Sequence, residues 1–191
     1  MAGTEGLMVS VSGIRGRVGE GLTPEVVARY VAAFGAWARK KTPGRPVVVG
    51  RDSRVSGPMF HRIAIGALQS VGVNVIDIGL TTTPTCQLSV EDHHAAGGLM
   101  LSASHNPIEW NALKFIGPTG MFLDAEEGRE MRAFTEGEVP RVTWDELGGW
   151  REDAGAIERH LERIHAIPFV DVERIRARRF RVALDCVRGA G

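Results

Sequence analysis

The sequence predicts an α/β protein: a three-layer α/β/α domain with a mixed sheet, followed by the truncated start of a second, similar α/β domain. Short apolar runs alternate along the chain with stretches of helical periodicity, which is the order of a layered α/β domain. Apolar residues make up 43% and charged residues 24% of the 191 residues, as in ordinary globular proteins. We expect the first domain over residues 1–140, a linker over 141–153 and an incomplete second domain over 154–191.

Continuous apolar runs indicate the strands of the first domain. Residues 45–50, "RPVVVG", have the pattern of a strand that is covered on both faces. The runs "VNVIDIGL" and "GGLMLSA" predict two further strands, and "LMVSVS" at 7–12 predicts a strand or an extended entry. The stretch "NALKFIGPTGMFL" predicts a hairpin, because the turn residues 117–120 join two apolar runs.

Helices are expected between these strands. Thr23 and Pro24 fit a helix start, and apolar residues recur at helical spacing as far as Ala38. A second helix is expected over 57–72 and a short one after Pro84. An acidic stretch from residue 124 opens a further helix, since the helix dipole favours carboxylates in the first turn.

The last part of the chain predicts the opening of another unit. Two helical stretches, 154–166 and 170–178, lead into "RFRVALDCV", which predicts a strand over 180–187 and then a glycine turn. Such a strand normally begins a further domain. An isolated strand edge invites pairing with another chain, so we expect residues 180–187 either to be disordered or to mediate self-association.

Charge and composition exclude several classes of protein. The chain has 23 Lys and Arg against 23 Asp and Glu, which argues against a nucleic-acid or membrane-surface protein. No apolar run approaches the ~20 residues that span a bilayer and no secretory signal is visible, so a cytoplasmic protein is expected. Cys86 and Cys186 lie next to expected buried segments, which favours two reduced core thiols over a disulfide.

Three polar clusters lie where strands and loops meet. The first, "SVSGIRGRVG" at 10–19, places Arg15 and Arg17 among glycines that allow unusual backbone angles. An arginine there can offer a planar fork to a phosphate or carboxylate. The alternative is a flexible turn with solvated arginines. The glycines do not form a dinucleotide fingerprint, because the strand and helix that flank such a fingerprint are missing.

The second cluster, "VGRDSRVSG" at 49–57, follows the carboxyl end of a buried strand, where α/β sheets usually bind ligands. Arg51, Asp52 and Arg54 crowd this loop. For Asp52 we favour a structural role, in which an ion pair with arginine shapes the loop and caps the following helix.

The third cluster is "SASHNP" at 102–107. A buried strand delivers Ser104 to a loop, and Pro107 restricts Asn106 to extended backbone angles. A serine hydroxyl is a poor nucleophile without a base or a metal, and His105 and Lys114 are the nearest candidates. The alternative is a turn in which Ser104 and Asn106 bond to the local backbone.

The remaining histidines are weaker candidates. His93 and His94 lack further ligands at helical spacing, which favours a role at a helix end over a metal site. His61, His160 and His165 fall on expected helices, and we interpret them as surface or partly packed residues.

Together, "SGIRGRVGEGLTPE", "GRDSRVSG" and "SASHNPIEWNALKF" resemble, in order, the first-domain motifs of the α-D-phosphohexomutase family. This family comprises phosphoglucomutase, phosphomannomutase and phosphoglucosamine mutase. "VALDCVRGAG" is similar to the strand that begins the family's second domain, so the resemblance covers nearly the whole chain. Two departures stand out. The first motif commonly reads F-G-T-D-G-I-R-G or Y-D-I-R-G, against V-S-V-S-G-I-R-G here, and Ser53 replaces a common glycine.

The resemblance implies roles for individual residues. Ser104 aligns with the serine that carries the transferable phosphate, and His105 and Lys114 align with residues that transfer protons or position phosphate. Arg15 aligns with an active-site arginine and is expected to bind phosphate.

Asn106 and Arg51 are also expected to bind the substrate or its phosphate, and Mg²⁺ is the implied cofactor. Ser104 would offer the metal one ligand through its phosphate. The family's metal loop, D-G-D-G-D-R, belongs to its second domain and is not found in this sequence.

The implied activity is movement of phosphate between C1 and C6 of a hexose or hexosamine phosphate, through phosphoserine and a bisphosphosugar. Such transfer needs alignment and charge neutralisation more than covalent help. We expect the 191-residue chain alone to be inactive, because the later substrate loops are missing. The alternative is a non-catalytic binding or regulatory module with the same fold. A serine hydrolase is disfavoured, since there is no G-x-S-x-G elbow.

Overall fold

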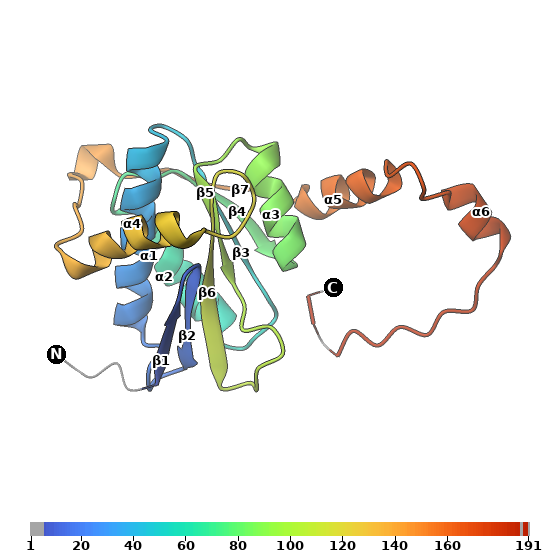
Figure 1. Cartoon of the computed structure of the whole chain (residues 1–191), viewed down its shortest axis with the longest axis horizontal. Helices are drawn as coiled ribbons and strands as arrows, with labels where there is room; N and C mark the ends of the chain where they lie inside the picture. Colours follow the sequence, from blue (N-terminus) through green and yellow to red (C-terminus); the bar gives the residue numbers. More distant parts are fainter. Residues whose placement is uncertain (1–5, 188, 191) are drawn as a thin grey trace.

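The computed structural model describes residues 6–187 and 189–190. Over these residues the chain forms one seven-stranded mixed sheet with helices on both faces (Figure 1), which confirms the predicted α/β/α class. The strands are β1 (Leu7–Ser10), β2 (Gly13–Arg17), β3 (Val47–Arg51), β4 (Val75–Leu80), β5 (Gly97–Leu101), β6 (Trp110–Ile116) and β7 (Trp150–Glu152). The helices are α1 (Pro24–Lys41), α2 (Gly57–Gln69), α3 (Thr83–Asp92), α4 (Ala125–Glu136), the 3-10 turn η1 (Trp144–Glu146), α5 (Ala156–His165) and α6 (Val172–Ala177).

The sheet has a parallel and an antiparallel half. Its order is β1-β2-β6-β5-β3-β4-β7. Strands β5, β3, β4 and β7 are parallel neighbours, whereas β5, β6, β2 and β1 pair antiparallel. The carboxyl ends of β3, β4 and β5 therefore share one edge with the start of β6, and the chain reverses there between Leu101 and Trp110.

Each face of the sheet has its own apolar core. On one face, α1, α2 and α4 pack against alternate residues of the central strands, and Phe34 stacks on Phe115 with ring centroids 4.9 Å apart. On the other face, α3 contributes Cys86 and Val90 to a smaller cluster with Met100. Helix α3 packs on β3 and β5, so it covers less of this second face than the three helices α1, α2 and α4 cover of the first.

The helix starts follow the sequence signals. Thr23 and Thr82 cap α1 and α3 through their hydroxyls, with proline near each first helical position. Asp124 and Glu127 form a complete capping box at α4. Of the helices in the described part of the chain, none has the length and apolar character to cross a membrane.

The predicted hairpin over residues 111–123 is present in a minimal form. After β6 the chain turns at residues 117–120, and an antiparallel bridge joins Ile116 to Phe122. The N–H of Gly117 donates to Met121 O at 2.7 Å, and the N–H of Leu123 donates to Phe115 O at 3.3 Å. The second arm does not extend into a full strand, because Asp124 caps α4 directly after it.

The expected linker over 141–153 contains regular structure. Residues 144–146 form η1, and β7 joins the sheet edge parallel to β4, with Val75 N donating to Gly149 O at 2.9 Å. Gly148 permits this approach, because a Cβ there would lie 2.0 Å from Val73 O. Glycine is thus a packing requirement at this position.

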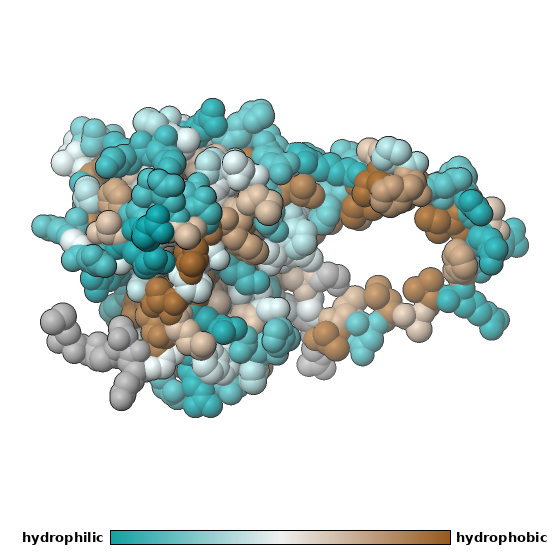
Figure 2. All heavy atoms as spheres, in the orientation of Figure 1, coloured by the Kyte–Doolittle hydropathy of each residue, from teal (hydrophilic) through white to brown (hydrophobic). Residues whose placement is uncertain are grey.

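The predicted strand over 180–187 is wrong. These residues have no regular secondary structure and are exposed, because none of the described strands lies beside them to supply hydrogen bonds. The C-terminal arm, residues 166–187, runs outward from the sheet as far as α6 and then turns back (Figure 1), and it carries exposed apolar side chains (Figure 2), among them Phe169 and Leu184. The start of a second α/β domain is not seen, and self-association through this segment stays a prediction.

The two thiols have opposite environments. Both cysteines are free. Cys86 is fully buried, and burial raises the pKa of its thiol to about 12. Cys186 lies exposed on the C-terminal arm, so the prediction that it is a core thiol is wrong.

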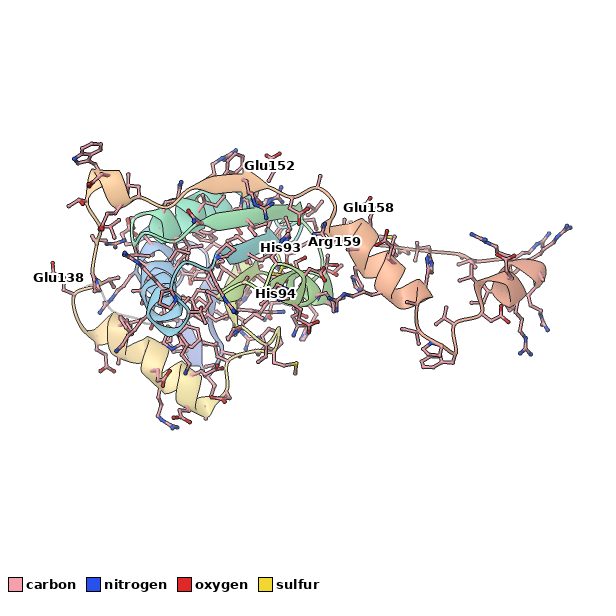
Figure 3. The ribbon with its side chains drawn as sticks, turned by 90° about the horizontal axis from the view of Figure 1, so that it is seen from above. His93, His94, Glu138, Glu152, Glu158 and Arg159 are labelled. Atoms are coloured by element: carbon pink, nitrogen blue, oxygen red, sulfur yellow. The ribbon has the colours of Figure 1, made fainter. Side chains whose placement is uncertain are left out.

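A charged network fastens α5 to α3. His93 Nε2 lies 2.7 Å from Asp153 Oδ2, and Arg159 bonds both oxygens of Asp153 and pairs with Asp92 at 3.4 Å. Figure 3 shows His93 beside Arg159 at the start of α5. Arg163, one turn further along α5, also pairs with Asp92. Burial raises the pKa of Asp153, but the hydrogen bonds from Arg159 and His93 outweigh it and lower the pKa to about 2.

We predict that Asp153→Asn loosens α5. Losing the charged partner costs about 1–3 kcal/mol, so the α5 amides should exchange with solvent about tenfold faster or more, as measured by hydrogen exchange. In the unsubstituted chain this stabilisation is present above the ordinary pKa of 3.8 and is lost as the pH falls through about 2. The control is Glu158→Gln, an exposed carboxylate on the same helix. Equal exchange in the two variants would contradict the prediction.

Candidate functional site

The β5–β6 loop opens onto a pocket at the carboxyl edge of the parallel strands. The pocket has a volume of about 370 Å³ and lies over the antiparallel half of the sheet. Its walls come from the β1–β2 hairpin, from β6 and from the loop, and its polar lining includes Ser10, Ser12, Arg15, Ser102, Ser104 and Lys114. The structure thus brings together residues that are nearly 100 positions apart in sequence.

Ser104 is presented to solvent on a strained backbone. Its φ is +55°, in the left-handed region that serine rarely adopts. Such a conformation costs about 1–3 kcal/mol and persists only when its surroundings enforce it. The N–H of Ser104 donates to Ser102 Oγ at 3.1 Å, and its own Oγ lies 3.4 Å from His105 Nδ1. The hydroxyl is therefore accessible at the pocket wall.

Arg15 approaches the loop from the neighbouring hairpin. It lies on β2, opposite Ala112 of β6, so the alternative of a flexible turn is wrong for this arginine. Arg15 Nη1 donates to Asn106 Oδ1 at 3.1 Å, and Nη2 lies 3.8 Å from Met8 Sδ. Asn106 therefore bonds to a pocket arginine, which fixes the guanidinium beside the Ser104 loop.

Lys114 is half-buried on β6, where it pairs with Gly13 of β2 and Met100 of β5. Glycine is required opposite it, because a Cβ on Gly13 would lie 2.3 Å from Leu113 O. Burial lowers the pKa of Lys114 below its ordinary value of 10.5, and the negative charge of Asp52 offsets part of that effect. A lysine in this state gives up its proton more readily than one in water.

The charged residues of the second cluster, residues 49–57, make different contacts. Arg51 Nη1 donates to Asp52 O at 3.1 Å and lies beside Gly57, so the structure does not bring Arg51 into the pocket. The ion pair expected for Asp52 is present, with Oδ2 3.3 Å from Arg54 Nε. Asp52 does not cap the next helix, however, since Ser56 holds the N-cap position of α2.

Two polar residues in the motifs at and after the loop, Ser102 and Asn111, were given no role from the sequence. Ser102 supports Ser104 through its hydroxyl, and the alternation of β5 could have placed it on the pocket face with Met100. Asn111 is fully buried and donates from Nδ2 to Ser56 Oγ at 2.8 Å. That contact joins the start of β6 to the start of α2 and has no local sequence signal.

The other histidines lie away from the pocket. His61 is buried and pairs with Asp77 at 2.9 Å, so its interpretation as a surface or partly packed residue is wrong. His93 follows the last residue of α3, as expected of a helix end. His160 lies 2.8 Å from Thr85 Oγ1, and His165 is exposed.

We predict that Lys114→Met raises the free energy of unfolding at pH 7, because burial disfavours the charged ammonium. The gain should shrink as the pH rises through the lowered pKa towards 10.5, since the folded chain then releases the proton before the unfolded chain does. Urea unfolding at pH 7 and near pH 10 measures this difference. The control, Lys40→Met, replaces an exposed lysine and should change stability by about 0.5 kcal/mol or less. A variant that is less stable than the parent at pH 7 would contradict the prediction.

Comparisons with known proteins agree with this geometry. Residues 7–140 match the family model for phosphoglucomutase/phosphomannomutase, alpha/beta/alpha domain I. The chain is 39% identical over 188 residues to a phosphoglucomutase/phosphomannomutase of Thermococcus kodakarensis, covering 97% of this chain and 41% of that protein. It is 38% identical over 184 residues to a probable phosphoglucosamine mutase of Methanopyrus kandleri, covering 96% of this chain and 39% of that protein.

A solved structure shows the same architecture. The crystal structure of a putative phosphomannomutase from Thermus thermophilus superposes with a TM-score of 0.76 at 29% identity, over 91% of this chain and 38% of that one. The chain thus spans about two fifths of the length of these relatives. The matched fold, the matched domain I and the identity over nearly the whole chain show that it belongs to the phosphoglucomutase/phosphomannomutase family.

Proposed function

We propose that this chain is the phosphoserine-bearing part of a phosphohexose mutase, which moves phosphate between C1 and C6 of a hexose or hexosamine phosphate. The observation that carries the proposal is the exposed Ser104 hydroxyl at the wall of a pocket that also holds Arg15 and Lys114. Relatives named as mutases of glucose, mannose and glucosamine phosphates support it.

In the proposed reaction, phospho-Ser104 donates its phosphoryl group to a free hydroxyl of the bound sugar phosphate. The P–Oγ bond breaks, a bond from phosphorus to the sugar oxygen forms, and the sugar hydroxyl loses its proton as Ser104 Oγ gains one. The resulting bisphosphosugar then returns its other phosphate to Ser104. The enzyme ends as it began, and the phosphate has changed position on the sugar.

The pocket residues have different roles in the proposed reaction. A phosphoserine carries about −1.5 to −2 charges, and the guanidinium of Arg15 lies where it can offset them. Lys114, with its lowered pKa, is suited to exchange the proton that each transfer moves. His105, whose Nδ1 lies 3.4 Å from Ser104 Oγ, is the second candidate for that role. Asn106 holds the arginine in place.

Mg²⁺ is part of the proposal, and this chain would supply only a fraction of its site. A bound Mg²⁺ neutralises charge on the phosphoryl group during transfer. The phosphate on Ser104 can offer one oxygen ligand. In the described part of the chain, no group of three or more His, Cys, Asp and Glu side chains could hold a metal ion. The residues present therefore do not form a complete metal site.

We predict that Ser104→Ala abolishes turnover in a full-length protein that contains this chain, because the phosphate then has no acceptor. The assay is conversion of a hexose 1-phosphate to the 6-phosphate. The matched control is Ser70→Ala, a serine at the end of α2 that should leave the rate unchanged. Intact-mass spectrometry of the unsubstituted protein should show one phosphate, and peptide mapping should place it on Ser104. Near-normal turnover of Ser104→Ala would remove the serine from the mechanism.

The 191-residue chain alone should have no appreciable mutase activity. The pocket is open, and the chain spans about two fifths of the length of its relatives. The same assay on the isolated chain tests this, and a rate near that of the full-length protein would contradict it.

A further inference from the structure

One arginine outside the pocket lining is hydrogen-bonded to the whole length of the Ser104 loop, residues 102–110. Arg54 Nη2 donates to Ser104 O at 2.9 Å and to Asn106 O at 2.7 Å. Its Nη1 donates to Pro107 O at 2.7 Å and to Trp110 O at 2.9 Å. Four backbone carbonyls of one loop thus converge on a single guanidinium.

The loop carbonyls occupy all four Nη donors of Arg54. A guanidinium carries five N–H groups. Four donate to the loop carbonyls, and the Nε group lies 3.3 Å from Asp52 Oδ2. The side chain is about nine tenths buried, with 11% exposed. The Nε group makes no hydrogen bond but is buried, so Arg54 has no accessible donor left for a phosphate, unlike Arg15, which lines the pocket.

The other hydrogen bonds from outside the loop backbone each hold a single point of it: Ser102 Oγ accepts from Ser104 N, Arg15 donates to Asn106 Oδ1, and Val18 N donates to Glu109 O at 2.9 Å. Within it, backbone hydrogen bonds run from Asn106 N to Ala103 O and from Trp110 N to Pro107 O, each at 3.1 Å. Ser104 has the left-handed φ of +55°, which needs external support. Arg54 bonds the carbonyl of that same residue, so it acts on the strained position directly.

Asp52 links Arg54 to the end of strand β5. Its Oδ1 accepts the backbone N–H of Arg54 at 3.1 Å, and its own N–H donates to Leu101 O at 2.9 Å. Leu101 is the last residue of β5, directly before the Ser104 loop. The loop after β3 and the loop after β5 are thereby joined into one unit.

We propose that Arg54 is a positioning residue: it holds the Ser104 loop in the conformation that presents the serine hydroxyl to the pocket. Its catalytic meaning rests on the proposed mutase function, whereas its effect on the loop does not. Lysine is no substitute, because a single ammonium group has three donors and lacks the planar fork that reaches four carbonyls. Removal of Arg54 leaves the serine chemically intact but displaced.

The first experiment measures hydrogen exchange in Arg54→Lys and Arg54→Ala. The amides of Ser104, Asn106 and Trp110 should exchange at least tenfold faster in both variants, while the β3 amides stay within about twofold of the parent. The control is Arg62→Ala, which removes an exposed arginine from α2. Arg54→Lys retains the charge and serves if Arg54→Ala does not fold. Unchanged loop exchange, or full protection in Arg54→Lys, would overturn the proposal.

The second experiment uses kinetics of a full-length protein that contains this chain. A displacement of about 1 Å can cost roughly 10²-fold in rate, so both Arg54 variants should lose about that factor in kcat with KM within about twofold. A raised KM with kcat unchanged would overturn the positioning role. If the unsubstituted protein shows neither turnover nor phosphate on Ser104, the mutase function fails, and the exchange result alone decides whether Arg54 holds the loop.

Discussion

The antiparallel pairing of β6 with β5 is the constraint on which the site depends. Strand β5 is buried over its whole length, so its position and register are fixed by packing on both faces. Because β6 returns beside it in the opposite direction, the chain must reverse at the carboxyl edge of the sheet. That reversal is the Ser104 loop, and the same pairing carries Lys114 into the pocket. Parallel strands with a helical crossover would have produced no such bend.

The uneven covering of the sheet supplies the second condition. The face under α1, α2 and α4 holds the larger core, and α3 covers β3 and β5 on the other face. The pocket occupies the part of that second face over β2 and β6. There Lys114 lies half-buried, and this burial accounts for the direction of its pKa shift. The uneven covering of the two sheet faces therefore also determines the environment of Lys114.

Local signals in the sequence predicted most of the sheet and its helices. The apolar run at 45–50, the cap at Thr23 and the acidic helix start from residue 124 are each visible in a few neighbouring residues, and the structure has the corresponding strand and helices. Strand β7 could not be predicted, because three exposed residues carry no alternation and are held by pairing with β4. The apolar pattern at 180–187 predicted a strand wrongly, since a pattern does not supply the partner that a strand requires.

The candidate site was likewise predictable from the sequence only in part. Ser104, Arg15, Lys114 and Asn106 could be named from motifs, and the structure brings them to one pocket wall or its border. Arg51 was named as well, yet its guanidinium turns towards its own loop. The contacts of Arg54 could not be predicted, because every residue has a backbone carbonyl and the sequence does not show which carbonyls an arginine will bond.

The contrast between the two cysteines has a practical consequence for spectroscopy. The thiol of Cys86 is sealed between α3 and the sheet and is almost wholly protonated at neutral pH. Cys186 is accessible on the C-terminal arm. A maleimide dye or a nitroxide spin label would therefore attach at one place without any substitution. Cys186 thus provides one labelling site, without mutation, for following the distance between the C-terminal arm and the sheet in solution.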